Sequence, residues 1–330
     1  MRRQGRIAGL TCPPFVAAFL FVSLAFAGSA RAQDTHVLVI AGVAGDEEHA
    51  AQFDKWAATL VDAARKDAPP TADIGYLADK PERDSKRITG RSTRENVEKA
   101  FADLAARVRP NDEVVVILIG HGSFDGRQAS FNLPGPDLTA ADYARLLSKF
   151  PSQRVVFVNT SSSSGGFLQP LAAPGRTIIT ATKTAGERND TRFPAFFAEA
   201  FSDPGADQNR DGRVSMSEAF EYAHNKVLQS YQKDGLLLTE HAALDDGNDG
   251  RLAATLFLQF DRSRTAIAEA TDPALKALLE QQRALEDQIA ALKLRQKTMD
   301  AAEYEQQMEK LLTDLAVKTR AIRALQDKKL

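Results

Sequence analysis

Two segments of this chain carry side chains that could perform acid–base or nucleophilic chemistry. His121 has a glycine on each side, and a run of four serines, Ser161–Ser164, precedes a Gly-Gly-Phe tripeptide further along the chain. An imidazole can serve as a general base, and a serine hydroxyl becomes a nucleophile when such a base lies within hydrogen-bond reach. The two segments could therefore form a hydrolytic site. A glycine-flanked histidine and a Ser-Gly-rich loop are also compatible with ordinary turns.

A second kind of chemistry is indicated by residues 207–218, which fit the twelve-residue calcium loop of an EF-hand. Oxygen-bearing side chains occupy the ligand positions, a glycine occupies the sharp turn, and one backbone carbonyl completes the set. The predicted ligands are Asp207, Asn209, Asp211, Arg213 (through its carbonyl), Ser215 and Glu218. Predicted helices at 194–201 and 216–228 flank the loop. We predict a Ca²⁺ site here, and the alternative is an acidic loop that only caps the second helix.

A single loop of this type lacks the partner loop of sensor EF-hands, so we expect weak, permanent calcium binding and not a switch. A second acidic segment, Asp245–Gly250, is interpreted as a turn. The histidines show neither an H-x-x-x-H nor an H-E-x-x-H spacing, so the sequence does not predict a zinc site.

The first 32 residues have the three parts of a secretory signal peptide. Arginines at positions 2, 3 and 6 precede an apolar run at 15–27, and Ala30-Arg31-Ala32 forms a cleavage site. We predict export to the periplasm or the exterior, with a mature chain that begins at Gln33. An uncleaved anchor is the alternative, although the apolar run is short for a membrane span. No further apolar run in the mature chain could cross a membrane.

The composition of the mature chain excludes cysteine chemistry and argues against binding of nucleic acid. Cys12, the only cysteine, lies in the predicted signal peptide, so the mature chain has neither disulfides nor a thiolate. The full chain has 42 basic and 44 acidic residues. Removal of the four arginines of the signal leaves 38 basic against 44 acidic residues, a net charge of −6. This acidic balance argues against a nucleic-acid partner.

The segments that must position these side chains alternate between strand and helix patterns. The predicted strands are apolar, β-branched runs at 36–43, 74–77, 113–119, 154–158, 177–182 and 252–260. The predicted helices are amphipathic and lie at 50–65, 92–108 (from a Ser92/Glu95 capping box) and 138–149. This order predicts an α/β fold in which helices cover both faces of a mostly parallel sheet. His121 and the serine run each follow a strand, at the edge where such sheets gather functional groups.

Together these features resemble the caspase-like fold of the clan CD cysteine peptidases, in particular the legumain (C13) family. In that family one strand ends in His-Gly, which supplies the catalytic histidine. The next parallel strand ends in a motif such as D-A-C-H-S-G-G-F, which supplies the cysteine nucleophile. The I-T-A-T run at 179–182 is also similar to the family pattern. The resemblance implies a caspase-like α/β domain over residues 33–265.

The resemblance gives His121 the place of the catalytic histidine and Ser162 that of the nucleophile, or Ser161 with a shift of one residue. A serine hydroxyl is far less nucleophilic than a thiol and needs a closely positioned base with an orienting carboxylate. We therefore favour a catalytically degenerate peptidase homologue that acts as a calcium-stabilised binding or scaffold protein for a protein or peptide partner. The alternative is a serine-dependent peptidase or esterase that uses Ser162 or Ser161 with His121.

The C-terminal part, residues 266–330, differs in composition from the rest. From residue 272 onward it has no glycine, and its leucines, isoleucines and methionines recur at heptad spacing. Two helices are predicted, at about 273–299 and 301–327, with a capping box at Asp300 and Glu303 between them. They could form an antiparallel hairpin or a continuous coiled coil, or pack on the preceding domain. We expect residues 273–327 to support self-association.

Overall fold

A computed structural model describes residues 34–70, 72–247, 250–260, 266–267, 270–295 and 299–327. The predicted signal peptide lies outside the described residues. No helix in the described part of the chain is long and apolar enough to cross a membrane.

The centre of the structure is a seven-stranded sheet in the order β10-β9-β8-β4-β1-β2-β3. Every neighbouring pair is parallel except β10 and β9, so the predicted mostly parallel α/β fold is confirmed. The strands are β1 (Thr35–Ala41), β2 (Asp73–Ala78), β3 (Gly90–Arg91), β4 (Glu113–Ile119), β8 (Arg154–Asn159), β9 (Arg176–Thr180) and β10 (Ala243–Asp245).

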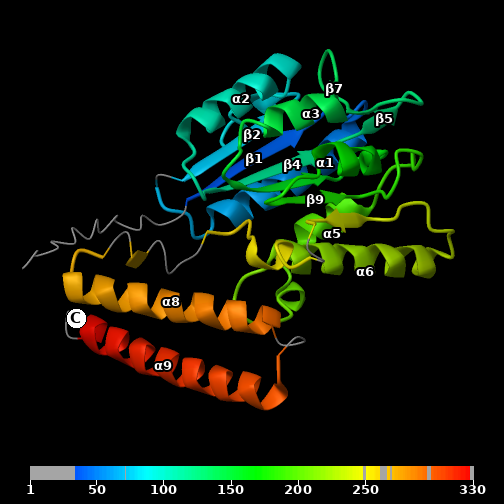
Figure 1. Cartoon of the computed structure of the whole chain (residues 1–330). Helices are drawn as coiled ribbons and strands as arrows, with labels where there is room; N and C mark the ends of the chain where they lie inside the picture. The colour runs from blue at the N-terminus through cyan, green and yellow to red at the C-terminus, as the bar shows by residue number, and fades with distance from the viewer. Residues whose placement is uncertain are drawn as a thin grey trace, which may run out of the picture. The chain divides into compact units, whose positions relative to one another are not determined.

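Helices cover both faces of this sheet (Figure 1). Alternate residues of β1 point to opposite faces: Val37 and Val39 belong to one apolar core, and Leu38 and Ile40 to the other. The first core includes residues of α1 (Glu47–Arg65), α5 (Phe193–Ala200) and α6 (Met216–Asp234). The second includes residues of α2 (Arg94–Arg107), α3 (Ala140–Leu147) and α4 (Leu168–Leu171).

Burial on two faces explains the composition of the central strands. β4 reads EVVVILI, and every one of its residues is buried. Strands with helices on both sides have no polar face, so they appear in the sequence as continuous apolar runs. The prediction at 113–119 was correct for this reason.

A small antiparallel sheet follows His121 and was not predicted. Its strands are β5 (Gly122–Phe124), β6 (Ala129–Phe131) and β7 (Leu138–Thr139). They are two or three residues long, which is too short for a periodic pattern in the sequence. The described residues also include four short 3-10 helices that were not predicted: η1 (Pro81–Asp84), η2 (Ser164–Phe167), η3 (Pro204–Ala206) and η4 (Ala253–Thr255).

Two local predictions were wrong. Thr93, and not Ser92, caps α2, because the Ser92 amide donates to the carbonyl of Ala78 and holds this residue beside β2. The expected strand at 252–260 is η4 followed by irregular chain with a single bridge, Ser215 to Phe257. Its alternating apolar residues Leu256 and Leu258 are buried in the first core, while β10 occupies the sheet edge beside β9.

The C-terminal part forms a hairpin of two helices, α8 (Pro273–Arg295) and α9 (Ala301–Asp327). The two helices lie side by side and run in opposite directions (Figure 1). Asp300 precedes α9 and accepts hydrogen bonds from the amides of Ala302 and Glu303. The antiparallel hairpin is therefore the correct one of the arrangements considered from the sequence.

Candidate functional site

The loops after β4 and β8 meet at one edge of the sheet, because these two strands are parallel neighbours. The Ser162 hydroxyl donates to the carbonyl of Gly122 (3.0 Å) and also lies 3.4 Å from the Gly122 amide. A Cβ atom on Gly122 would lie only 2.1 Å from the Ser162 carbonyl oxygen. Glycine at position 122 therefore allows the two loops to come together, and the sequence-predicted residues do lie close in space.

The four serines make hydrogen bonds within their own loop and to the loops after β4 and β9. The Ser161 hydroxyl is fully buried and donates to the Asn159 side-chain oxygen at 2.7 Å. Ser163 adopts a left-handed conformation (φ 57°), and its amide donates to the carbonyl of Glu187. The Ser164 hydroxyl lies 3.2 Å from that of Thr182. This loop is fixed by hydrogen bonds at each serine.

His121 is directed at other partners. Its Nε2 lies 3.1 Å from the carbonyl oxygen of Ala44, and its Nδ1 lies 3.3 Å from a carboxylate oxygen of Asp190. The Phe53 ring contacts the imidazole edge-on, with 5.2 Å between ring centroids. Neither Ser161 nor Ser162 is among the hydrogen-bond partners of this ring in the described structure.

A second histidine, not singled out from the sequence, lies beside the first. His49, in the first turn of α1, has its ring centroid 4.8 Å from that of His121. Its Nδ1 lies 2.7 Å from the carboxylate of Asp46, and its Nε2 lies 3.5 Å from that of Asp190. The hydrogen bond to Asp46 raises the pKa of His49 above its ordinary value, and burial opposes this shift.

Asp190 joins this group from the loop between β9 and α5. The loop is held directly after Asp190: the Thr191 hydroxyl donates to the carbonyl of Thr160 (2.6 Å), and the Arg192 amide donates to buried Glu240 (2.7 Å). His49, His121 and Asp190 therefore come from three separate segments. No spacing rule on the sequence could have grouped them, because only the sheet order brings these segments to one edge.

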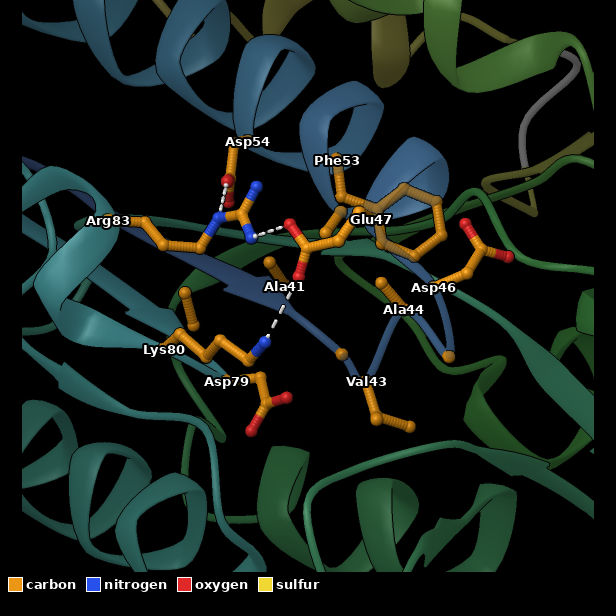
Figure 2. Close-up of a pocket in the computed structure, with 14 residues that line it drawn as sticks. Ala41, Val43, Ala44, Asp46, Glu47, Phe53, Asp54, Asp79, Lys80 and Arg83 are labelled. Atoms are coloured by element: carbon orange, nitrogen blue, oxygen red, sulfur yellow. Dashed lines mark hydrogen bonds and ion pairs between the residues drawn. The ribbon is translucent and has the colours of Figure 1, made fainter.

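A pocket of about 290 Å³ lies next to this group, at the carboxyl ends of β1 and β2 (Figure 2). Ala44, Asp46 and Phe53 line it and also contact the two histidines. On its other side Arg83 donates to Glu47 (2.8 Å) and Asp54 (2.6 Å), as Figure 2 shows. The pocket is thus lined both by apolar residues, such as Ala44 and Phe53, and by the ion pairs of Arg83.

The loop 207–218 has a compact arrangement of oxygen atoms. Asp207 accepts hydrogen bonds from the amides of Asp211 (3.1 Å) and Gly212 (2.8 Å), and Asn209 accepts one from Asp211 (2.9 Å). Gly212 has a positive φ of 88°, which a side chain would disfavour. The side-chain oxygens are therefore turned over the interior of the loop, and such a set of hard oxygen donors suits Ca²⁺.

Glu218 joins the two ends of this loop. One carboxylate oxygen accepts from the amides of Gln208 (3.1 Å) and Asn209 (3.2 Å), and the other accepts from the amide and hydroxyl of Ser215. Ser215 also pairs with Phe257 through a backbone bridge. The loop therefore has an ordered neighbour, although that neighbour is not a second EF-hand loop.

In the second acidic segment, Asp246 lies before η4 and contacts the chain that leads into it. Asp246 accepts hydrogen bonds from the amides of Gly250 (2.9 Å), Leu252 (2.8 Å) and Ala253 (3.1 Å). These bonds order the start of this short helix.

The fold and this edge define an α/β protein with a histidine after the fourth strand of a parallel sheet and a small-residue loop after the next one. The family model of the peptidase C13 family matches residues 66–243, which is more than half of the chain. The chain therefore belongs to the peptidase C13 family, as its resemblance to legumain-type sequences predicted.

Solved structures resemble the chain only distantly. Protein GSU0716 from Geobacter sulfurreducens aligns over 64% of this chain and 92% of its own, with 12% identity and a TM-score of 0.42. The Drosophila initiator caspase Dronc aligns over 73% and 92%, with 11% identity and a TM-score of 0.42. The structure of drICE aligns over 66% and 89%, with 10% identity and a TM-score of 0.38. No curated protein matches the chain.

Proposed function

We propose that this protein is an exported, catalytically degenerate member of the peptidase C13 family that binds a protein or peptide partner. One observation carries the proposal. Ser162, in the position that the family motif gives to the nucleophile, donates its hydroxyl to the carbonyl of Gly122, while His121 is directed at Ala44 and Asp190. A serine nucleophile needs its hydroxyl proton directed at a base, and that pairing is absent between these described residues.

The test is labelling of the full-length protein with a fluorophosphonate, which reacts with activated serines. We expect no labelling of Ser162 or Ser161 above that of a Ser162→Ala, Ser161→Ala double variant. Labelling that disappears in this double variant and in His121→Ala, but survives in His241→Ala, would contradict the proposal. It would favour the alternative function, a serine-dependent hydrolase.

We further propose that Ca²⁺ at loop 207–218 stabilises the domain. The support is the set of oxygen atoms over the loop interior, together with the bridge from Ser215 to Phe257, which ties the loop to the buried segment around Leu256. Calcium bound by Asp207, Asn209, Asp211, the Arg213 carbonyl, Ser215 and Glu218 would draw together the start of α6 and the preceding chain. An exterior or periplasmic location suits a weak site of this kind.

A role for the helical hairpin in self-association completes the proposal. Leu312 and Val317 on α9 are about half exposed (49% and 59%). An open apolar groove runs along the same helix past Met308 and Leu312. Met308 and Leu312 lie four residues apart and so share one face of α9, and an exposed apolar face of this kind is typical of a helix that packs against a second chain.

A further inference from the structure

We propose that His49, His121 and Asp190 form a binding site for a divalent transition-metal ion, specifically Zn²⁺. One ligand atom from each residue can be chosen so that all three lie within 4.8 Å of one another. Two imidazoles and one carboxylate are a common protein ligand set for zinc, and they leave the fourth position open. This site is separate from the calcium loop in both its residues and its donor atoms.

The hydrogen bonds around the two rings decide which nitrogen atoms are available. The Ala44 carbonyl can only accept, so Nε2 of His121 carries the hydrogen, and in the neutral ring Nδ1 presents its lone pair toward Asp190. Asp46 likewise accepts from Nδ1 of His49, which leaves the lone pair of Nε2 facing Asp190. Both free nitrogens thus face the same carboxylate.

This pattern is the one by which proteins orient histidine ligands. A metal-binding histidine usually donates its second ring N–H to a carboxylate or a backbone carbonyl, which fixes the tautomer and the ring orientation. Here Asp46 performs this role for His49, and the Ala44 carbonyl performs it for His121. A pair of histidines that served only as ion-pair partners of Asp190 would not need either contact.

The spacing requires only a small adjustment of side chains. Ligand atoms around a tetrahedral zinc ion lie ~3.3 Å apart, given bonds of about 2.0–2.1 Å. Nδ1 of His121 lies 3.3 Å from Oδ1 of Asp190, and Nε2 of His49 lies 3.5 Å from Oδ2, so rotation of the exposed carboxylate would bring one oxygen to this spacing from both nitrogens. The two ring nitrogens must approach each other further, and the side chains of His49 and His121 are 29% and 25% exposed, so both rings have room to turn.

The charge balance also favours a dication. Two neutral rings and the Asp190 carboxylate would leave a bound Zn²⁺ with one net positive charge, and Asp46 behind His49 would compensate it. Asp190 is 68% exposed, so the ion has a path from solvent. The open position would accept water or a donor atom of a bound partner, at the edge where an active member of the family would bind its substrate.

The test is a zinc titration of the full-length protein by calorimetry, in excess Ca²⁺ so that the calcium loop does not compete. We expect one zinc ion per chain, with affinity lowered more than 100-fold in His49→Ala, His121→Ala and Asp190→Asn. Asp46→Asn keeps a side-chain oxygen that can cap α1 but removes the carboxylate behind His49, and it should lower the affinity about tenfold. His241→Ala, a matched control at an exposed histidine outside the group, should bind as the wild type does.

Two further measurements check that the variants fold and that the bound metal is tetrahedral. Circular dichroism of the metal-free variants identifies any that fail to fold, and the Asp46→Asn and Asp190→Asn variants then carry the comparison. Co²⁺ added in place of zinc should give the intense visible absorption of a tetrahedral site in the wild type alone. The proposal is overturned if the wild type binds no zinc, or if zinc affinity is unchanged in His49→Ala and falls instead in Glu218→Gln.

Discussion

Gly122 determines how closely the histidine loop and the serine loop approach each other. A side chain here would collide with the Ser162 carbonyl oxygen at 2.1 Å and with the Ser161 hydroxyl at 2.6 Å. Both atoms belong to buried serines whose hydroxyls are hydrogen-bonded. Neither serine can move aside without weakening these hydrogen bonds. The absence of a side chain at residue 122 therefore sets the distance between the loops after β4 and β8.

We predict that Gly122→Ala lowers the free energy of unfolding by about 2 kcal/mol, within the usual cost of overpacking a close contact. Gly186→Ala is the matched control, because its added Cβ would have its nearest contact at 3.6 Å and φ there is ordinary. That variant should change stability by less than ~0.5 kcal/mol. Urea denaturation of both variants measures the difference, and equal stabilities would contradict the proposed role of this contact.

The sequence identified some of the residues at this edge and missed others. His121, Ser161 and Ser162 could be located because each lies directly after an apolar strand. His49 and Asp190 carry no such signal: one lies in the first turn of a helix and the other in an irregular loop. Their importance comes from distances to His121, which depend on tertiary structure.

Among the secondary-structure elements, long and buried segments were predicted best. The central residues of β4 and β8 are all apolar because helices cover both faces, and α1 and α6 are long enough to show their periodicity. The short strands β5, β6 and β7 have no such pattern. The expected strand at 252–260 failed because alternating burial can arise without strand pairing.

Loop 207–218 and helix α6 give a prediction about calcium. Removal of Ca²⁺ from the wild type should lower the melting temperature by about 5–10 °C, when the ion is initially present at about 100 times its dissociation constant. Re-addition of Ca²⁺ should restore it. In Asp207→Ala this calcium-dependent shift should vanish, because one carboxylate ligand is lost.

Differential scanning calorimetry with and without chelator measures these shifts. Asp245→Asn is the matched control, since Asp245 lies in the neighbouring acidic turn, where it accepts from the Gly247 amide. It should keep the full calcium-dependent shift. A wild-type melting temperature that does not respond to calcium would show that the loop is only a cap for α6.

For the whole molecule, the α/β part and the helical hairpin have different roles in our proposal. The family model ends at residue 243, so α8 and α9 lie beyond the part that the family defines. The hairpin is closed by contacts between its own helices, including Gln282 with Thr319 at 3.5 Å. Apolar residues left exposed on α9 are then available to a second copy.

We predict that a chain ending at Ser263 sediments as a smaller assembly than the full-length protein. A point variant separates this effect from general loss of structure: Leu312→Glu should weaken the assembly because it places a charge in the apolar groove of α9. Leu237→Glu is the control, an exposed leucine outside the hairpin (85% exposed). Sedimentation velocity over a range of concentrations gives the assembly sizes, and identical assemblies for all four proteins would exclude a role for the hairpin.

The sequence by itself determined the order of the long strands and helices, the family and the loop with calcium-type ligands. These features are recorded locally, in apolar periodicity and in the spacing of residues within short segments. Tertiary structure alone decided which side chains meet at the edge of the sheet. Strand order places α1, the β4 loop and the loop before α5 side by side, and such neighbourhoods depend on packing across segments distant in the chain. For this reason the sequence suggested that His121 pairs with a serine nucleophile, whereas in the structure His121 contacts His49 and Asp190.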